Sequence, residues 1–375
     1  MKENDKKNSD ELNENTKIYL DGISYFYGID KSINYKKAYE VFHKLHQDNK
    51  YYVKESQLFL GQMHYKGLYV IQSYRKAIEY FKYAAKNHSG KAYYFLGEIA
   101  EKKILDKEDE DKVYDDVAFS YYNKAANLGL SEANAKIGLI LEQGLLKTVK
   151  DLKQAAEQFK KSVDIDDNAI GLNGLGNVYY EGKVCEKNYE QALDCYERSI
   201  QLGNIDALNN AGICYEYGLG TKTDKEKALA LYSKAKDKYH GEGMANYAIL
   251  KIKNAIATGN YECFSECLKI LFYASLLRKS NPEIYYYIGL MYELGIDLFN
   301  DNNIIKNCYL AFVHYKKSGQ LGSPKALTKV AICLFNGIEG AISVNKKASE
   351  KLLEKAVELG DKEAEKYLKF IQKEE

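Results

Sequence analysis

The sequence predicts an all-α solenoid of about nine helix-turn-helix repeats, and three observations lead to this fold class. The chain of 375 residues contains only two prolines, far below the average usage of roughly 5%, so few positions interrupt a helix. Small residues recur in one pattern along most of the chain, and helix-capping residues recur at a fixed offset from it. Self-similarity at a period of about 20–50 residues is typical of repeat architectures.

The first segment of seven repeats carries a small residue that is followed six places later by glycine, and two degenerate repeats keep the small residue but have Lys103 or Asn254 in place of the glycine. In "NGLGNVYYEG" the small residue and the glycine are Gly176 and Gly182, with Leu175 and Tyr179 at positions −1 and +3 from the first glycine. That spacing places the three residues on one helix face, and the second glycine suits a helix end because glycine adopts left-handed backbone angles at little cost. The nine pairs are Gly22/Gly28, Gly61/Gly67, Gly97/Lys103, Gly138/Gly144, Gly176/Gly182, Gly212/Gly218, Ala248/Asn254, Gly289/Gly295 and Ala331/Gly337.

The second segment of each repeat predicts another helix. In "ALDCYERSIQLG" (192–203) and "AFVHYKKSGQLG" (311–322), small residues stand at positions 0 and +7 and bulky ones at +3 and +4, which is one face of an α-helix. A capping residue precedes the small residue by four places in seven repeats, where its side chain can accept a free amide of the first turn. These residues are Asn34, Ser73, Asp151, Asn188, Asp224, Asn307 and Asn345.

Three regions follow along the chain. Residues 1–16 are polar and are expected to be disordered. Residues 17–360 form the solenoid, with repeats that begin near 17, 56, 92, 133, 171, 207, 243, 284 and 326, and residues 361–375 form a C-terminal capping helix with a polar outer face. Insertions at 102–116 and 296–307 separate the helices of two repeats, and they are either binding loops or solvated spacers.

The combined pattern, LG-x-x-Y-x-x-G followed by A-x-x-Y-Y-x-K-A-A-x-x-G, resembles Sel-one-like repeats, which are relatives of tetratricopeptide repeats. The resemblance covers roughly residues 17–360, and the repeats anchored at Gly97 and Ala248 depart from it most. It implies a right-handed α/α superhelix whose first helices line the concave face. It also implies a scaffold or adaptor role, attached in several systems to protein quality control, cell-wall assembly or bacterial signalling.

Composition disfavours several other classes of protein. The formal net charge is +1, so no basic stripe indicates nucleic-acid binding, and most of the 35 tyrosines occupy the core positions of the repeat. No apolar run approaches the ~18 residues of a membrane span, and the start lacks the apolar core of a secretory signal. The seven cysteines are odd in number and irregularly spaced, which favours buried free thiols in a reducing cytoplasm.

Candidate chemical sites are weak. "GLGTKT" (218–223) resembles a phosphate loop, but Gly220 is followed by Thr221 rather than lysine, so Gly218 is expected to end a helix instead. His43 and His46 lack a third ligand at zinc spacing, and Cys263 and Cys267 fit buried apolar positions. No metal, cofactor or catalytic residue is expected, and a hydrolase is disfavoured because no nucleophile–base pair stands out.

The remaining candidate is a binding groove. In the related tetratricopeptide geometry, positions −3, +1 and +4 around the small anchor face the concave side, and the set contains no Lys or Arg, which disfavours a clamp for a C-terminal carboxylate. Asparagines can bond a peptide backbone and tyrosine adds apolar area, although a +4 glutamate can also be an ordinary solvated helix residue. The predicted groove residues are Tyr94, Glu98, Glu101, Asn173, Asn177, Tyr180, Asn209, Ile213, Glu216, Tyr286, Leu290 and Glu293.

The sequence therefore predicts a non-catalytic scaffold or adaptor that holds protein or peptide segments, extended or helical and neutral to basic, within a signalling or quality-control complex. The alternative is a regulatory subunit or activator of a membrane-bound or cell-wall-synthesising enzyme. The partner, the pathway and the oligomeric state stay open at this point.

Overall fold

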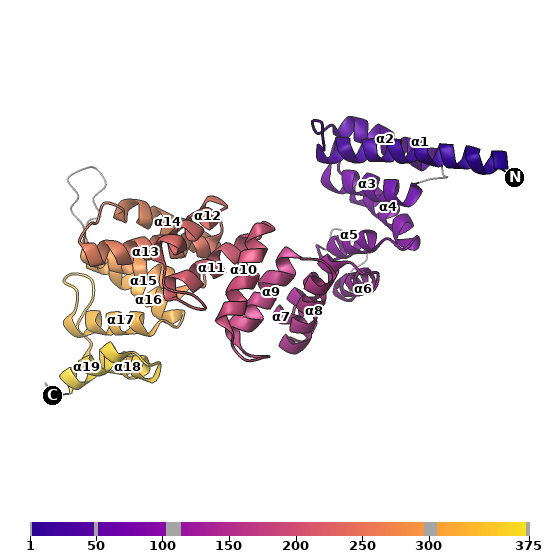
Figure 1. The fold of residues 1–375 in the computed structure, drawn as a ribbon. Coiled ribbons are helices and arrows are strands. Elements are labelled where there is room, and N and C mark those ends of the chain that lie inside the picture. The colour runs from indigo at the N-terminus through magenta and orange to yellow at the C-terminus, as the bar shows by residue number, and fades with distance from the viewer. Residues whose placement is uncertain (1, 49–51, 103–113, 296–305, 373–375) are drawn as a thin grey trace. The chain divides into compact units, whose positions relative to one another are not determined.

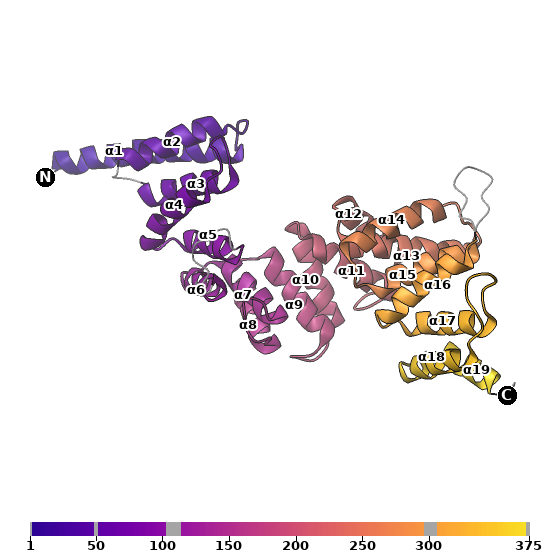
Figure 2. The same ribbon diagram turned by 180° about the vertical axis from the view of Figure 1, so that it is seen from behind.

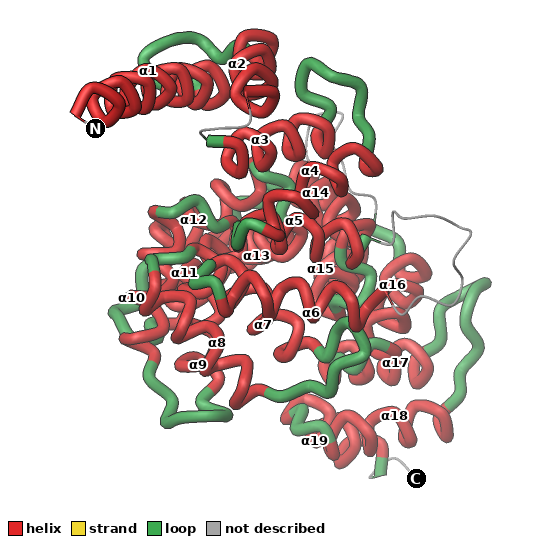
Figure 3. The backbone as a smooth tube through the Cα atoms, turned by 90° about the vertical axis from the view of Figure 1, so that its right-hand side faces the viewer, coloured by secondary structure: helices red, strands yellow, loops and turns green. Residues whose placement is uncertain are grey.

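The computed structural model of the protein describes residues 2–48, 52–102, 114–295 and 306–372. This part of the chain consists of nineteen α-helices joined by turns and loops, drawn in red and green in Figure 3. Its only β-type pairing is an isolated antiparallel bridge between Ile338 and Ile342. The chain divides into two compact bodies, residues 1–202 and residues 203–375, and each is described by itself.

The N-terminal body contains ten helices, coloured indigo to magenta in Figure 1. They are α1 (Lys2–Tyr27), α2 (Tyr35–Asp48), α3 (Val53–Lys66), α4 (Tyr74–Lys86), α5 (Gly90–Glu101), α6 (Tyr114–Asn127), α7 (Ser131–Gln143), α8 (Leu152–Ile165), α9 (Ala169–Glu181) and α10 (Tyr189–Gln201).

The C-terminal body contains nine helices, which Figure 2 shows from behind. They are α11 (Ile205–Tyr217), α12 (Lys225–Asp237), α13 (Gly241–Thr258), α14 (Phe264–Leu277), α15 (Pro282–Leu294), α16 (Cys308–Gln320), α17 (Pro324–Asn336), α18 (Lys346–Glu358) and α19 (Lys362–Ile371).

The helices pair as the repeat pattern predicts. Each odd-numbered helix from α1 to α17 packs against the even-numbered helix that follows it, which gives nine pairs, and successive pairs within a body pack against each other. From α3 onward, the first helix of every pair begins two or three residues before the predicted start. The all-α solenoid is therefore confirmed, and the pairs are called repeats 1 to 9 below.

The predicted caps of the second helices are confirmed. The Asp224 carboxylate accepts a hydrogen bond from the Lys227 amide at 2.8 Å, and the Asn188 side chain accepts one from the Gln191 amide at 3.0 Å. The same contact is made by the other five residues, which are Asn34, Ser73, Asp151, Asn307 and Asn345. Each satisfies one amide that the helix leaves unpaired.

The small anchor of the first helix lies under a large side chain of the second. In repeat 6 a Cβ added to Gly212 would lie 2.5 Å from a ring carbon of the buried Tyr232, a distance that real Cβ atoms do not reach. The same arrangement pairs Gly22 with Phe42, Gly61 with Phe81, Gly97 with Tyr122, Gly138 with Phe159, Gly176 with Tyr196, and Gly289 with Tyr315. Glycine is thus needed at the anchor so that helix backbone and ring can touch.

The N-terminal segment differs from the expectation. Residues 1–16 were expected to be disordered, whereas α1 already begins at Lys2. The segment contains no glycine or proline before Gly22 and is rich in lysine and glutamate, which favour helix locally. The polarity of the segment does not oppose helix formation.

At the other end, α19 packs against α17 and α18 through the buried Ala364 and Ile371. Its outer face is less polar than expected, since Tyr367 and Phe370 are 37% and 51% exposed. Most of both insertions, 103–113 and 296–305, lies outside the described residues. Among the described helices, none combines the length and the apolar character that a bilayer crossing requires.

Candidate functional site

The twelve predicted groove residues lie on four first helices, α5 and α9 in the N-terminal body and α11 and α15 in the C-terminal body. Their exposure is uneven. Asn173 and Asn209 are buried, at 9% and 6% exposure, and the other ten are half-buried. The surface available to a partner is therefore formed by the half-buried side chains, not by a fully exposed polar row.

Glu216 shows what the +4 glutamates do. Tyr232 of α12 donates its hydroxyl proton to Glu216 Oε2 at 3.0 Å, and Lys253 of α13 donates from Nζ to Glu216 Oε1 at 3.0 Å. The carboxylate side chain is only 8% exposed. It thus joins its own repeat's second helix to the first helix of the next repeat.

This contact, called the Tyr–Glu–Lys bridge below, recurs in both bodies. Glu101 accepts from Tyr122 at 2.6 Å and from Lys136 at 2.8 Å. Glu293 accepts from Tyr315 and, at 3.0 Å, from Lys329. Three glutamates expected to face a ligand are thereby held in the structure itself.

Burial and the bridge both act on the ionisation of its members. Burial raises the pKa of Tyr232, and the adjacent Glu216 raises it further, so the hydroxyl stays protonated and donates. Burial by itself lowers the pKa of Lys253, but its hydrogen bond and charge interaction with Glu216 outweigh burial, and the net shift is upward. The bridge is therefore a charged pair with a neutral donor, and its net charge is close to zero.

The bridges change the expected electrostatics of the groove. The predicted set contains no cation, but Lys136, Lys253 and Lys329 come from neighbouring first helices and lie against its glutamates. Burial also raises the pKa of Glu98, which reduces the tendency of that carboxyl group to ionise. With these glutamates compensated by lysines, little negative charge is left in the groove to favour a basic ligand.

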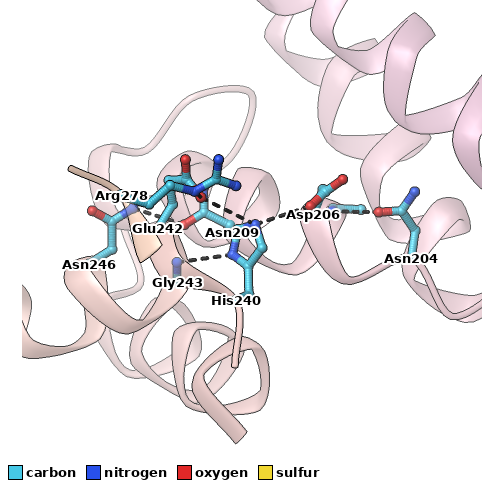
Figure 4. A network of polar contacts seen from close by, with 9 residues as sticks. Asn204, Asp206, Asn209, His240, Glu242, Gly243, Asn246 and Arg278 are labelled. Atoms are coloured by element: carbon cyan, nitrogen blue, oxygen red, sulfur yellow. Dashed lines mark hydrogen bonds and ion pairs between the residues drawn. The ribbon is translucent and has the colours of Figure 1, made fainter. Parts of the chain in front are cut away.

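The asparagines also connect helices. Tyr196 of α10 donates to Asn177 Oδ1 at 2.9 Å, and the Asn246 side-chain amide of α13 donates to Asn209 Oδ1 at 2.9 Å, as Figure 4 shows. Asn177 and Asn209 thus already serve as acceptors within the protein. A peptide backbone that binds to these asparagines would have to compete with the internal hydrogen bonds.

A polar network at the start of α13 was missed by sequence reasoning (Figure 4). His240 Nδ1 accepts a hydrogen bond from the Gly243 amide at 3.0 Å, so the imidazole caps the helix. Its Nε2 lies 3.1 Å from Asp206 Oδ1, and the hydrogen bond to His240 lowers the pKa of that carboxyl group. Glu242 lies within ion-pair distance of Arg278. A signal for this cap was present in the sequence. Asn204 caps the first helix of repeat 6, and His240 stands at the matching position directly before the first helix of repeat 7.

The weaker candidates resolve as structural features. Gly218 ends α11 in the left-handed conformation at φ 69°, so the sequence "GLGTKT" is the turn between two helices, as predicted. His43 and His46 each contact a glutamine side chain, and among the described residues no three His, Cys, Asp or Glu side chains are grouped as metal ligands. All seven cysteines are free, but Cys185 and Cys308 are exposed, which corrects the expectation of uniformly buried thiols.

A family model for the Sel1 repeat matches eight segments of the chain. They are residues 18–44, 54–89, 90–130, 131–164, 169–204, 205–240, 282–323 and 324–361. The longest stretch that it leaves out, 241–281, contains α13 and α14 of repeat 7. The chain folds a helix pair there even though the sequence departs from the repeat.

Solved structures share the fold. A protective antigen of uropathogenic Escherichia coli with an SLR fold superposes with a TM-score of 0.62 at 20% identity, over 97% of this chain and 73% of that one. A Sel1 repeat protein from Oxalobacter formigenes gives a TM-score of 0.52 at 26% identity, over 61% of this chain and 90% of that one.

Curated relatives are distant and longer. Chitin synthase regulatory factor 3 of Schizosaccharomyces pombe is 23% identical over 287 residues, which are 73% of this chain and 28% of that protein. An uncharacterized protein of Neisseria meningitidis serogroup B is 25% identical over 198 residues, 45% of this chain and 41% of that protein. The chain thus spans less than half the length of either relative.

Proposed function

Because the chain belongs to the Sel1 repeat family, whose members are generally protein-interaction scaffolds, we propose that it is a non-catalytic scaffold or adaptor that holds protein partners. The observation that carries this proposal is the succession of helix pairs within each body, nine pairs in all, because stacked helix pairs offer extended surface. A reducing cytoplasm is the compartment proposed for it, in keeping with seven free cysteines. Assembly of a signalling or quality-control complex is the role proposed.

The proposed binding surface is the predicted groove, taken separately in each body. In the N-terminal body Tyr180 and Asn177 on α9 are half-buried and one turn apart, and in the C-terminal body Ile213 and Leu290 add half-buried apolar area. Tyrosine and aliphatic side chains that are partly accessible gain from being covered by a partner. Because the bridges compensate the glutamates, a neutral helical or extended segment fits better than a strongly basic one.

The test is a quantitative pull-down of partners by the intact protein and by Asn177→Ala plus Tyr180→Ala. If α9 lines the groove, the double variant loses a partner that the intact protein retains. Tyr196→Phe is the matched control, because it removes the same internal hydrogen bond to Asn177 and leaves the proposed surface intact. Equal retention of all partners by the double variant contradicts the groove assignment.

A second candidate function is regulation of a membrane-bound or cell-wall-synthesising enzyme. It is favoured by the similarity to a protein described as a chitin synthase regulatory factor, which extends over 73% of this chain. The test adds the purified chain to membranes that contain a polysaccharide synthase and measures sugar incorporation. An unchanged rate at saturating protein removes this alternative and leaves the scaffold proposal standing.

A further inference from the structure

Helix α14 of repeat 7 has an unusually apolar exposed face. Its exposed residues include Phe272 at 38%, Tyr273 at 47%, Leu276 at 67% and Leu277 at 47%. The corresponding helices α12 and α18 expose almost only charged side chains, such as Lys225, Glu226, Lys347, Lys351 and Glu354. The core-facing side of α14 is already complete, because Phe264, Cys267, Leu271 and Ala274 are buried. The outer apolar residues therefore do not serve the packing of their own repeat.

The exposed residues belong to a continuous patch on two elements. The ring of Tyr273 lies 6.3 Å from that of Tyr239, which is 71% exposed in the turn before α13. The ring of Phe272 lies 5.8 Å from that of His314 on α16. From these fractions the patch exposes on the order of 500 Å² of apolar side chain, within the range in which such patches are often functional.

Cations border this patch. Lys269 precedes Phe272 by three residues and so belongs to the same outer stripe of α14, and Lys279 lies in the turn that directly follows the helix. Lys238 adjoins Tyr239 in the sequence, and all three lysines are exposed. Two carboxylates near the rim in the sequence have their own partners, since Glu266 pairs with Lys251 at 3.3 Å and Asp237 with Lys236 at 3.0 Å.

We propose that this patch, formed by Tyr239, Phe272, Tyr273 and Leu276, docks a short partner helix whose apolar face is flanked by Asp and Glu. The spacing of Lys269, Phe272 and Leu276 makes a ridge on α14 about 10 Å long at 1.5 Å per residue, with a cation at its N-terminal end. A helix of about two turns matches that length and packs ridge into groove. Acidic flanks match the lysines and exclude basic competitors.

Charge also decides between occupants. A second copy of the chain related by two-fold symmetry brings the same patch and the same lysines to the interface, and that arrangement lacks the carboxylates that the rim requires. The patch lies on the second helix α14 and the turn before α13, and so contains none of the residues of the proposed groove on first helices. It is therefore a second interaction surface, independent of the groove assignment.

The test uses the full chain and a fluorescent synthetic helix of about fifteen residues, with leucines at helical spacing and glutamates on both flanks. A matched peptide carries lysines in place of the glutamates. Fluorescence anisotropy is expected to show binding of the acidic peptide at least about tenfold tighter than binding of the basic one. Equal affinity for the two peptides, or binding of neither, overturns the proposal.

Variants locate the binding. Tyr273→Ser plus Leu276→Ser is expected to weaken the acidic peptide by about tenfold or more, whereas Leu359→Ser, at a residue 51% exposed near the end of α18, is the control and changes nothing. Lys269→Glu plus Lys279→Glu is expected to reverse the preference toward the basic peptide. Circular dichroism verifies the fold of each variant, and a preference that survives the charge reversal contradicts the proposal.

Two further measurements distinguish a partner helix from other occupants of the patch and distinguish binding at the patch from binding at the groove. Sedimentation of the full chain at high concentration and binding to anionic vesicles are compared with and without the Tyr273→Ser and Leu276→Ser changes. Patch-dependent self-association or vesicle binding, without peptide binding, replaces the partner helix by a second copy or a lipid surface. The groove variant Asn177→Ala plus Tyr180→Ala is expected to bind the acidic peptide with unchanged affinity, so failure of one proposal leaves the other intact.

Discussion

Repeats 6 and 7 stand side by side in the C-terminal body but solve the same packing problem differently. In repeat 6, Gly212 lies under the ring of Tyr232. In repeat 7, Ala248 occupies the anchor and the second helix presents Leu271 four places after its own small residue, Cys267, with both residues buried. A smaller side chain above the anchor thus accompanies a larger anchor below it.

The same exchange occurs in repeat 9, where Ala331 is buried with Leu353, while the other six repeats pair glycine with a ring. The two positions therefore act as one packing unit whose combined volume is nearly constant. When the ring is a tyrosine, its hydroxyl can also donate a hydrogen bond to the glutamate at +4, as in the Tyr–Glu–Lys bridge, whereas leucine has no donor. The packing choice and the polar link between repeats are coupled.

The helix ends differ for a related reason. In repeat 6, Gly218 terminates α11 at thirteen residues. In repeat 7, Asn254 stands at that position and α13 continues to Thr258, so that it reaches eighteen residues before Gly259 ends it. The sequence signal of repeat 7 is weak because both of its glycines are replaced, but the helix pair persists.

The largest expected effect comes from breaking the glycine–ring unit. Gly212→Ala is expected to lower the free energy of unfolding by about 2 kcal/mol, because the added Cβ forces the Tyr232 ring to move, and the higher helix propensity of alanine offsets only part of this. Urea denaturation measures the change. Adding Tyr232→Leu is expected to restore much of the loss, and Ala331→Gly, the control, costs about 1 kcal/mol or less. Additive effects of the two changes in repeat 6 contradict the coupling.

The reverse graft sharpens the comparison. Leu271→Tyr places a ring over Ala248 and is expected to cost about 1.5 kcal/mol from overpacking. Combining it with Ala248→Gly is expected to recover most of the lost stability, although glycine weakens the helix by about 1 kcal/mol. Thermal unfolding of the single and double variants measures both effects. A double variant no more stable than Leu271→Tyr alone shows that other contacts decide the pairing.

The bridge itself is expected to contribute less. Tyr232→Phe keeps the ring and removes the hydrogen bond to Glu216, which costs about 1 kcal/mol. The raised pKa values of Tyr232 and Lys253 mean that this contribution is complete below their unfolded values of 10.0 and 10.5 and is lost as the pH rises past them. Urea unfolding at neutral and at alkaline pH measures the difference between the variant and the wild type, which is expected to shrink at alkaline pH. A difference that does not depend on pH contradicts the assigned role.

The smallest effect concerns the cap of the divergent repeat. His240→Ala is expected to destabilise the protein by about 1 kcal/mol, and His240→Asn, which keeps a cap acceptor but loses the Asp206 contact, by a few tenths. The His240 contact lowers the pKa of Asp206, so its contribution is present above the unfolded value of 3.8 and is lost as the pH falls further. Urea unfolding at mildly acidic and strongly acidic pH measures both effects. Equal loss of stability in the two variants indicates that the contact between His240 and Asp206, and not the helix cap, stabilises the protein.

Most of the fold was predictable, but much of the candidate site was not. The caps at Asn188 and Asp224 and the anchor Gly212 are local features, because they depend on residues a few places apart. The partners of Glu216 are not local, since Tyr232 and Lys253 come from two other helices. The sequence pattern around a glutamate at +4 does not depend on whether that glutamate is solvated, binds a ligand or forms a bridge. Its role could therefore not be assigned from the sequence.

The sequence by itself determined the helix pairs, their caps and the repeat to which they belong, because helix periodicity and capping act over distances of three to seven residues. Only the tertiary structure decided which side chains are free. It paired three of the four glutamates of the expected groove with lysines of the next repeat and left the apolar face of α14 uncovered. Burial and charge compensation depend on which helices become neighbours, and that is set by packing across repeats.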